Sequence, residues 1–296
     1  MFGASGSVGT ALVQRIAHRL PVVTTYLHAR SDRSALRLLT LLTDICAPSG
    51  MMVVKQLSNV NVLILCAGVS TRGFGGTDKK GQLFEKNNDL VNEWVAATPA
   101  RIILLATNPC SEIGSGLAGP GMSPVYAVGL QNDNRRFFHS AGSNAGYLIG
   151  RHHFTQLLLG LSNGNGTARH DFSLDAYRDI SKCQDDLLAA NSWLELGEHV
   201  RSLSPTLRWW ASQRLNTVVN GSSHSCAEAT VEILTGLLKR EGVVTLESRF
   251  RFAEIAAKPV YIGWPVNLAE LSPLALQLEV TDLERLLLGQ DHRPNA

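Results

Sequence analysis

Two apolar runs constrain the fold of this 296-residue chain more than any other feature. Residues 59–66 read NVNVLILC and residues 100–106 read ARIILLA. Runs of this kind are typical of parallel strands that are covered on both faces. Between them, apolar residues recur at helical spacing over residues 83–95. Because buried strands alternate with helices, the sequence predicts the α/β class with a doubly wound parallel sheet.

A glycine-rich turn opens the chain. Residues 3–9 read GASGSVG and precede a helical pattern of apolar residues that continues to Ile16 and Ala17. Glycines let the backbone approach a phosphate closely, and the N-terminus of a helix favours negative charge. The loop therefore predicts a Rossmann-type dinucleotide site, with the candidate cofactor-binding residues Gly3, Gly6, Ser7, Val8 and Gly9.

The start of this predicted domain is unusual. Such a loop normally follows a buried strand in the middle of the sheet, but only Met1 and Phe2 precede it. The absence of that strand would expose the edges of both its neighbours. This pattern leads to the hypothesis that the first strand is truncated.

The stretch after the second predicted strand bears on the choice of cofactor. Residues 21–28 (PVVTTYLH) predict that strand, and an acid near its end would bind the ribose 2′-hydroxyl of NAD. The next residues are Ala29, Arg30 and Ser31, and the first acid is Asp32. Arg30 and Ser31 suit the 2′-phosphate of NADP. In the alternative, Arg30 is a solvated loop residue and Asp32 binds NAD, so both cofactors stay open.

The densest set of reactive groups lies in residues 128–153, which read VGLQNDNRRFFHSAGSNAGYLIGRHH. A short strand at 125–129 is expected to lead into a helix, with Asn132 or Asp133 as its N-cap. An apolar strand at 147–149 then delivers the sequence GRHH. Two short elements are therefore predicted to bring an acid, arginines and a histidine close together.

These groups suit an anionic substrate and proton transfer. Arg136 can grip a carboxylate through two parallel N–H bonds, and His152 can exchange a proton near neutral pH. Asp133 can orient that histidine and stabilise its charged form. In the alternative, Asp133 and Arg136 are an ordinary helix ion pair, and His152 and His153 form a solvated strand end.

Composition argues against several other classes. Hydrophobic residues make up 45% and charged residues 18%, as in a globular enzyme rather than a disordered protein. A net charge of +2 without a long basic block argues against nucleic-acid binding. The five cysteines are odd in number and lack a CxxC pair, which predicts reduced thiols and no metal site. No apolar run reaches membrane-spanning length and no signal-peptide pattern is present, so we expect a soluble, cytoplasmic protein.

In their order and spacing, these segments resemble the lactate/malate dehydrogenase family, as a divergent malate dehydrogenase-like member. The matching pieces run through both halves of the chain. They are residues 3–9, CAGV at 66–69, LFEKN at 83–87, TNP at 107–109, DNRRF at 133–137, GRH at 150–152, a helix at 227–238, the strand VYIGWP at 260–265 and a helix at 278–288.

The resemblance assigns roles to particular residues. His152 takes the place of the family's proton donor and acceptor, paired with Asp133, and Arg136 that of the arginine which binds the substrate carboxylate. Asn108 matches the asparagine near the nicotinamide and the substrate. Ser222, in a Gly-Ser-Ser segment beside the substrate, is a candidate contact. Gly68 and Asn87 match cofactor-side positions.

The loop at residues 70–81 has the glycine-rich composition of a closing lid. In malate-type members this loop carries two arginines. Arg72 matches the one for the distal carboxylate, and Lys80 stands where the second polarises the reacting carbonyl. Lysine keeps the charge but loses the planar bidentate grip. His153 and Phe154 also depart from the family pattern, which has Gly-Asp or Gly-Ser after the histidine.

The resemblance implies an oxidoreductase that transfers a hydride between a nicotinamide dinucleotide, NAD or NADP, and a small 2-hydroxy acid, with malate/oxaloacetate favoured. Alternatives are a lactate-type or other 2-hydroxy acid dehydrogenase, or a catalytically silent dinucleotide-binding paralogue. Residues 1–110 are expected to form the NAD(P)-binding Rossmann domain. Residues 111–296 are expected to form an α+β substrate domain with antiparallel strands in residues 246–268. A homodimer or homotetramer is expected, with no nucleic-acid or membrane partner.

Overall fold

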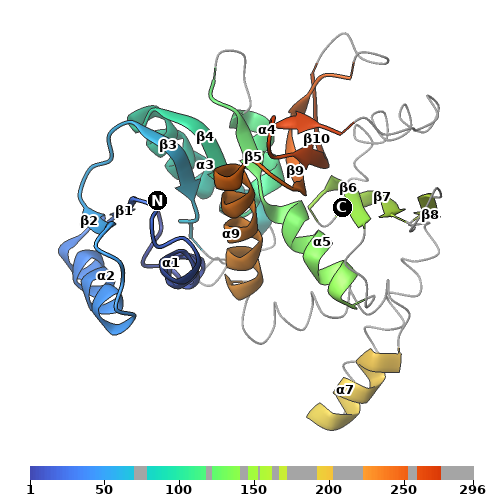
Figure 1. Ribbon diagram of the computed structural model, residues 1–296, viewed down its shortest axis with the longest axis horizontal. Helices are drawn as coiled ribbons and strands as arrows, with labels where there is room; N and C mark the ends of the chain where they lie inside the picture. The colour runs from blue at the N-terminus through green and yellow to red at the C-terminus, as the bar shows by residue number, and fades with distance from the viewer. Residues whose placement is uncertain are drawn as a thin grey trace.

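The computed structural model describes residues 1–69, 79–117, 122–140, 146–152, 154–161, 167–171, 192–202, 223–252 and 259–274. In the first part of the chain, helices and strands alternate (Figure 1). The elements are α1 (Ser7–Arg19), β1 (Thr25–His28), α2 (Asp32–Asp44), β2 (Met51–Val54), β3 (Val60–Leu65), α3 (Lys79–Ala97), β4 (Ala100–Leu105), α4 (Cys110–Leu117) and β5 (Val125–Ala127).

Two of the parallel strands, β3 and β4, are those that the apolar runs predict. β1 and β2 pair in a small parallel sheet, and β3, β4 and β5 are parallel neighbours in a larger one. In both β3 and β4 the last three residues are buried, which explains why their carboxyl-terminal halves are wholly apolar. The predicted α/β class with a parallel sheet is confirmed.

The second part of the chain extends the same sheet with antiparallel strands. Its elements are α5 (Gly129–Ser140), β6 (Gly146–Arg151), β7 (Phe154–Leu161), β8 (Thr167–Asp171), α7 (Trp193–Ser202), α9 (Ser223–Lys239), β9 (Val243–Phe250), β10 (Val260–Asn267) and β11 (Ser272–Pro273). The strand order is β3-β4-β5-β9-β10-β6-β7-β8, with β11 on β10. The expected antiparallel strands in residues 246–268 are β9 and β10.

The two kinds of pairing meet at one point. Ala127 of β5 pairs antiparallel with Glu247 of β9, and Glu247 pairs on its other side with Gly263 of β10. One sheet therefore contains strands from both sides of residue 110, where the predicted cofactor domain ends. A glutamate occupies the strand position at which the parallel part gives way to the antiparallel part.

Met1 and Phe2 lie between β1 and β3, where the first strand of such a sheet is expected. The amide of Phe2 donates to the Ile64 carbonyl at 2.9 Å, and the amide of His28 donates to the Met1 carbonyl at 3.0 Å. The Phe2 ring stacks on Trp94 with a centroid distance of 4.8 Å. These two residues therefore cover part of both strand edges that the sequence predicted to be exposed.

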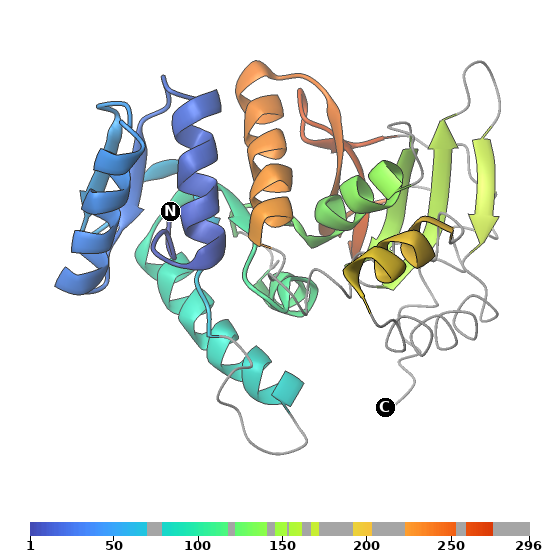
Figure 2. The same ribbon diagram turned by 90° about the horizontal axis from the view of Figure 1, so that it is seen from below.

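Helices α1 and α9 lie side by side, although they come from opposite ends of the chain (Figure 2). Arg15 Nε lies 2.5 Å from Glu228 Oε1, and Arg19 Nη1 lies 2.8 Å from the other carboxylate oxygen. The helix that follows the glycine loop is thus held by the C-terminal half of the chain. None of the described helices is long and apolar enough to cross a membrane.

The core offers a direct test of the fold. Leu105 on β4 is 0% exposed and belongs to a cluster with Leu63, Leu65 and Ile113. Leu105→Ala is expected to lower the free energy of unfolding by about 2–5 kcal/mol, because it leaves a cavity in a packed core. Urea denaturation followed by circular dichroism measures the change. The control, Leu36→Ala on the exposed side of α2, is expected to stay within about 0.5 kcal/mol of wild type.

Candidate active site

The first turns of α5 carry a run of buried polar residues. Gln131 Oε1 accepts the amide of Thr245 on β9 at 2.8 Å, and Asn134 Oδ1 accepts the amide of Leu148 on β6 at 2.7 Å. Buried amide side chains are tolerated where they find such partners. These two bonds fix α5 against both strands, and they flank Asp133.

The predicted N-cap at Asn132 or Asp133 is wrong. The amide of Asn132 donates to the Val128 carbonyl at 3.1 Å, so the helix begins one turn earlier, at Gly129. Asp133 therefore lies inside the helix. Its side chain is fully buried, and the orientation of that side chain follows from its position within α5 and not from a role as N-cap.

Asp133 and His152 form a close pair. Their Oδ2 and Nδ1 atoms are 2.7 Å apart, and the two side chains are 0% and 11% exposed. An ionised carboxylate can only accept, so Nδ1 carries the proton in this bond. The second ring nitrogen, Nε2, is then the atom of His152 that can exchange a proton with a ligand.

The imidazole has room only because residue 129 is glycine. A Cβ placed on Gly129 would lie 2.5 Å from the Cys110 sulfur and 2.6 Å from Cγ of His152. Burial raises the pKa of the Cys110 thiol well above its ordinary value, and the nearby Glu247 raises it further. Cys110 therefore contributes a neutral sulfur that packs against the ring.

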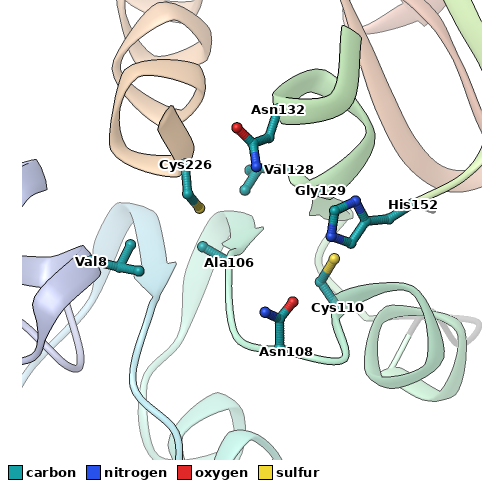
Figure 3. A pocket seen from close by; sticks show the side chains of 9 residues that line it. All are labelled: Val8, Ala106, Asn108, Cys110, Val128, Gly129, Asn132, His152 and Cys226. Carbon is teal, nitrogen blue, oxygen red and sulfur yellow. The ribbon is translucent and has the colours of Figure 1, made fainter. Parts of the chain in front are cut away.

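A pocket joins this pair to the glycine loop (Figure 3). Side chains from five separate segments surround it, and His152 and Asn132 reach it from opposite sides of Gly129 in the view. Asn132 is 3% exposed, and its Oδ1 has no hydrogen-bond partner among the described residues. The lining residues are Val8, Ala106, Asn108, Cys110, Val128, Gly129, Asn132, His152 and Cys226.

The glycine loop has the form that the sequence predicts. Gly6 is the N-cap residue of α1 and makes no side-chain cap, while Gly6 and Ser7 are exposed. A Cβ on Gly9 would overlap the carbonyl group of Gly3, so the loop closes tightly on the helix. The first amides of α1 therefore receive no acceptor from the side chain of the N-cap residue.

Asn87 and Asn108 lie together beyond the carboxyl ends of β3 and β4. Asn87 Oδ1 accepts the amide of Val69 at 2.7 Å, and its Nδ2 donates to the Asn108 carbonyl at 2.6 Å. Gly68 packs directly against the Asn87 side chain. Asn87 is thus committed to shaping the two strand ends, whereas the Asn108 side chain is exposed and lines the pocket.

Known proteins share this fold. No family model matches the chain, and no curated protein matches its sequence. Two solved structures align over nearly its whole length, each with a TM-score of 0.63. One is malate dehydrogenase from Naegleria fowleri ATCC 30863, which is 13% identical, with 98% of this chain and 93% of that chain covered. The other is MGS-M5, a lactate dehydrogenase from a Medee basin deep-sea metagenome library, which is 15% identical, with 98% and 94% covered.

The chain has the fold of the malate and lactate dehydrogenases. The resemblance inferred from the sequence motifs is therefore confirmed for the fold. Within this dehydrogenase fold, the pocket lies beyond the carboxyl end of β4, where open parallel sheets bind their ligands.

Several predicted substrate residues fall outside the part of the dehydrogenase fold that the structure describes. Arg72 and Ser222 lie outside the described residues. The backbones of Lys80 and Arg136 are described, in α3 and α5, but their side chains are not. The predicted loop at 70–81 is wrong at its end, because α3 begins at Lys79 and includes Lys80 in its first turn.

The predicted 2′-phosphate contact lies at the end of β1. Arg30 is exposed, two residues after His28. The Ser31 hydroxyl accepts the amide of Ser34 at 3.2 Å and so caps α2. Asp32 lies 3.3 Å from the Lys55 ammonium in an exposed ion pair. Of these three side chains, those of Ser31 and Asp32 make local contacts, and that of Arg30 is exposed.

Sequence reasoning missed one acid of this site. Glu247 on β9 is 0% exposed, and its Oε1 accepts the main-chain amide of His152 at 3.1 Å. Burial raises its pKa to about 7. The sequence could have marked Glu247 as a candidate, because it is the one charged residue within the buried stretch VTLES at 244–248.

Proposed function

We propose that this protein is a nicotinamide-dependent oxidoreductase that transfers a hydride between NAD or NADP and a small 2-hydroxy acid, with malate/oxaloacetate favoured. The observation that carries the proposal is the 2.7 Å pair of His152 and Asp133, with His152 in the same pocket as Val8 of the glycine loop and Asn108. A proton-exchanging group thus shares one pocket with a dinucleotide-type loop. Residues 1–110 are proposed to hold the cofactor and residues 111–296 the substrate.

The loop fits a dinucleotide. Gly6 leaves the start of α1 without a side-chain cap, and the close packing of Gly9 on Gly3 keeps the loop free of bulk. Gly3, Gly6, Ser7, Val8 and Gly9 would hold the pyrophosphate. When bound, the nicotinamide supplies or accepts the hydride.

His152 and Asp133 supply the proton chemistry. In the reduction of a 2-oxo acid, Nε2 of protonated His152 gives its proton to the oxygen that becomes the hydroxyl. Asp133 keeps the Nδ1 proton in place and stabilises the imidazolium. In the reverse direction, neutral His152 takes the hydroxyl proton at Nε2.

The remaining candidates bind and orient the substrate. We propose that Arg136 holds the carboxylate next to the reacting carbon and that Asn108 contacts the substrate or nicotinamide from the pocket wall. Arg72 is proposed to bind the distal carboxylate, Lys80 to polarise the carbonyl and Ser222 to contact the substrate. Gly68 and Asn87 shape the strand ends beside the cofactor. The active species is proposed to be a homodimer or homotetramer.

The test of this function is the consumption of reduced nicotinamide with oxaloacetate, measured with NADH and with NADPH in parallel. Turnover that is lost in His152→Asn supports the proposal. Turnover with pyruvate but not with oxaloacetate would favour a lactate-type enzyme. Cofactor binding by calorimetry without turnover of any 2-oxo acid would favour the silent paralogue. Lys80 and His153, which depart from the family pattern, are the residues that favour this alternative.

Substitution of Arg30 tests whether the protein prefers NADP to NAD. Because it is exposed at the end of β1, Arg30→Ala is expected to raise KM for NADPH about 10- to 100-fold, from the loss of a charge-assisted bond. KM for NADH is expected to stay unchanged. Arg37→Ala, an exposed arginine further along α2, is the matched control. Equal effects on both cofactors would remove Arg30 from the 2′-phosphate site.

A further inference from the structure

The acid at the junction of the parallel and antiparallel strands has no role in the reaction outlined above. Glu247 lies between Ala127 of β5 and Gly263 of β10, and its side chain is 0% exposed. Acids are almost never fully buried unless they are paired. Its Oε1 accepts the main-chain amide of His152 at 3.1 Å, so the acid is attached to the residue that exchanges the proton.

The surroundings give the carboxyl too few donors for a full negative charge. Glu247 Oε2, Ser111 Oγ and Tyr261 Oη are buried without a hydrogen-bond partner among the described residues. An ionised carboxylate taken out of water needs several donors to compensate. Among the described residues, the titratable or charged groups that act on Glu247 or on its buried neighbours Cys110 and Tyr261 are those two residues themselves, Glu112 on α4, Asp133 on α5, Arg151 and His152 at the end of β6, and Cys226 on α9.

These neighbours act on Glu247 in opposite directions. Burial raises its pKa to about 7, and the Asp133 carboxylate adds to the rise. The Ser111 hydroxyl, although not in hydrogen-bond geometry, and the positive form of His152 lower the pKa. A neutral imidazole therefore favours the protonated acid, and an imidazolium favours the carboxylate.

We propose that Glu247 is a positioning residue for the His152–Asp133 pair. It holds the His152 main chain through Oε1, and it is protonated when the imidazole is neutral and ionised when the imidazole is charged. The inference rests on the proposed function, because the coupling matters only if His152 exchanges a proton with a substrate. With a neutral imidazole and a protonated Glu247, the three groups together hold one negative charge, that of Asp133. With an imidazolium and an ionised Glu247, they hold the same net charge and the same number of protons.

The coupling returns the site to its starting state after each proton transfer. When His152 gives its proton to the substrate oxygen, Asp133 and Glu247 are left as two carboxylates beside a neutral ring. The site then takes up one proton, which restores one negative charge. That net charge is the same whether the proton is held at Glu247 or at the imidazole.

The test compares wild type with E247Q and with E232Q as a matched control. Glutamine keeps an oxygen that can accept the His152 amide, but it cannot ionise. Glu232 lies on α9, where it binds Gln131 and Arg135 outside the pocket. The readout is the NMR titration of the His152 imidazole, identified by its absence in His152→Asn, and it requires no activity.

The imidazole of His152 is expected to bind its proton about tenfold more weakly in E247Q than in wild type or E232Q, because the carboxylate that favours the imidazolium is gone. The pH profile of kcat is expected to lose one ionisation. A His152 titration that is the same in all three proteins would overturn the proposal.

Stability provides a second readout. The folded-state pKa of about 7 lies above the ordinary value of 4.5, so a neutral Glu247 stabilises the fold fully below pH 4.5. That stabilisation is lost as the pH rises through 7, and the Tm of wild type relative to E247Q is expected to fall over this range. A constant difference in Tm contradicts the proposal. If E247Q does not fold, the carboxyl carbon of Glu247 is titrated in wild type, where a midpoint near 4.5 overturns it.

The two proposals fail separately. A wild type without turnover in which the His152 titration still depends on Glu247 contradicts the dehydrogenase function and keeps the coupling. An active wild type in which His152 titrates independently of Glu247 keeps the function and removes the coupling.

Discussion

His152→Asn is expected to lower kcat for reduction of the 2-oxo acid by about 10³-fold, because general acid catalysis by a positioned side chain contributes 10²–10⁴-fold. Asparagine fills similar space but cannot give up a proton. The KM for the reduced cofactor is expected to stay close to wild type, since the glycine loop lies on another element. Initial rates with saturating cofactor measure the change.

The matched control is His18→Asn, which removes an exposed imidazole from the last turn of α1. It is expected to leave kcat unchanged. If His152→Asn retains more than about a tenth of the wild-type kcat, general acid catalysis by this residue is contradicted.

Asp133→Asn is expected to lower kcat by about 10²-fold or more with little change in KM for the cofactor. The asparagine amide can donate to Nδ1, which moves the ring proton to Nε2 and leaves the imidazolium without its buried counter-charge. Steady-state rates across pH measure the effect. The largest deficit is expected in the reduction direction, which requires the imidazolium.

Asp44→Asn, at the exposed end of α2, is the control for the loss of one carboxylate. It is expected to behave as wild type. A full rate in Asp133→Asn would mean that the helix and the strand, rather than the charge, hold His152 in place.

The elements that the sequence predicted well are those with strong periodicity. β3 and β4 carry continuous apolar runs, and α3 and α9 carry long helical patterns, so their type follows from local residues alone. β2 was not predicted, because its four residues, MMVV, show no alternation of apolar and polar side chains. The start of α5 was placed one turn too late, because Asn132 and Asp133 have the composition of a cap but lie inside the helix and are buried.

The site was predicted in part, because motif residues reveal chemistry but not partners. Asp133 and His152 were paired from their residue types and order, and the structure places them 2.7 Å apart. Glu247 could not be connected to them, because it is 95 residues from His152 and meets it only through strand pairing. Asn87 was predicted to lie on the cofactor side. Its side-chain amide makes hydrogen bonds with the backbone of Val69 and Asn108, and these partners follow two different strands, so local sequence could not indicate them.

The pairing of β5 with β9 also constrains the order of assembly. Ala127 and Glu247 are 120 residues apart, and α1 meets α9 across an even longer stretch of chain. Contacts between such distant segments carry a large loop-closure entropy and slow the folding of a domain. On the ribosome, the glycine loop emerges long before α9, whose Cys226 lines the same pocket as Val8. The pocket is therefore completed only after α9 has been synthesised.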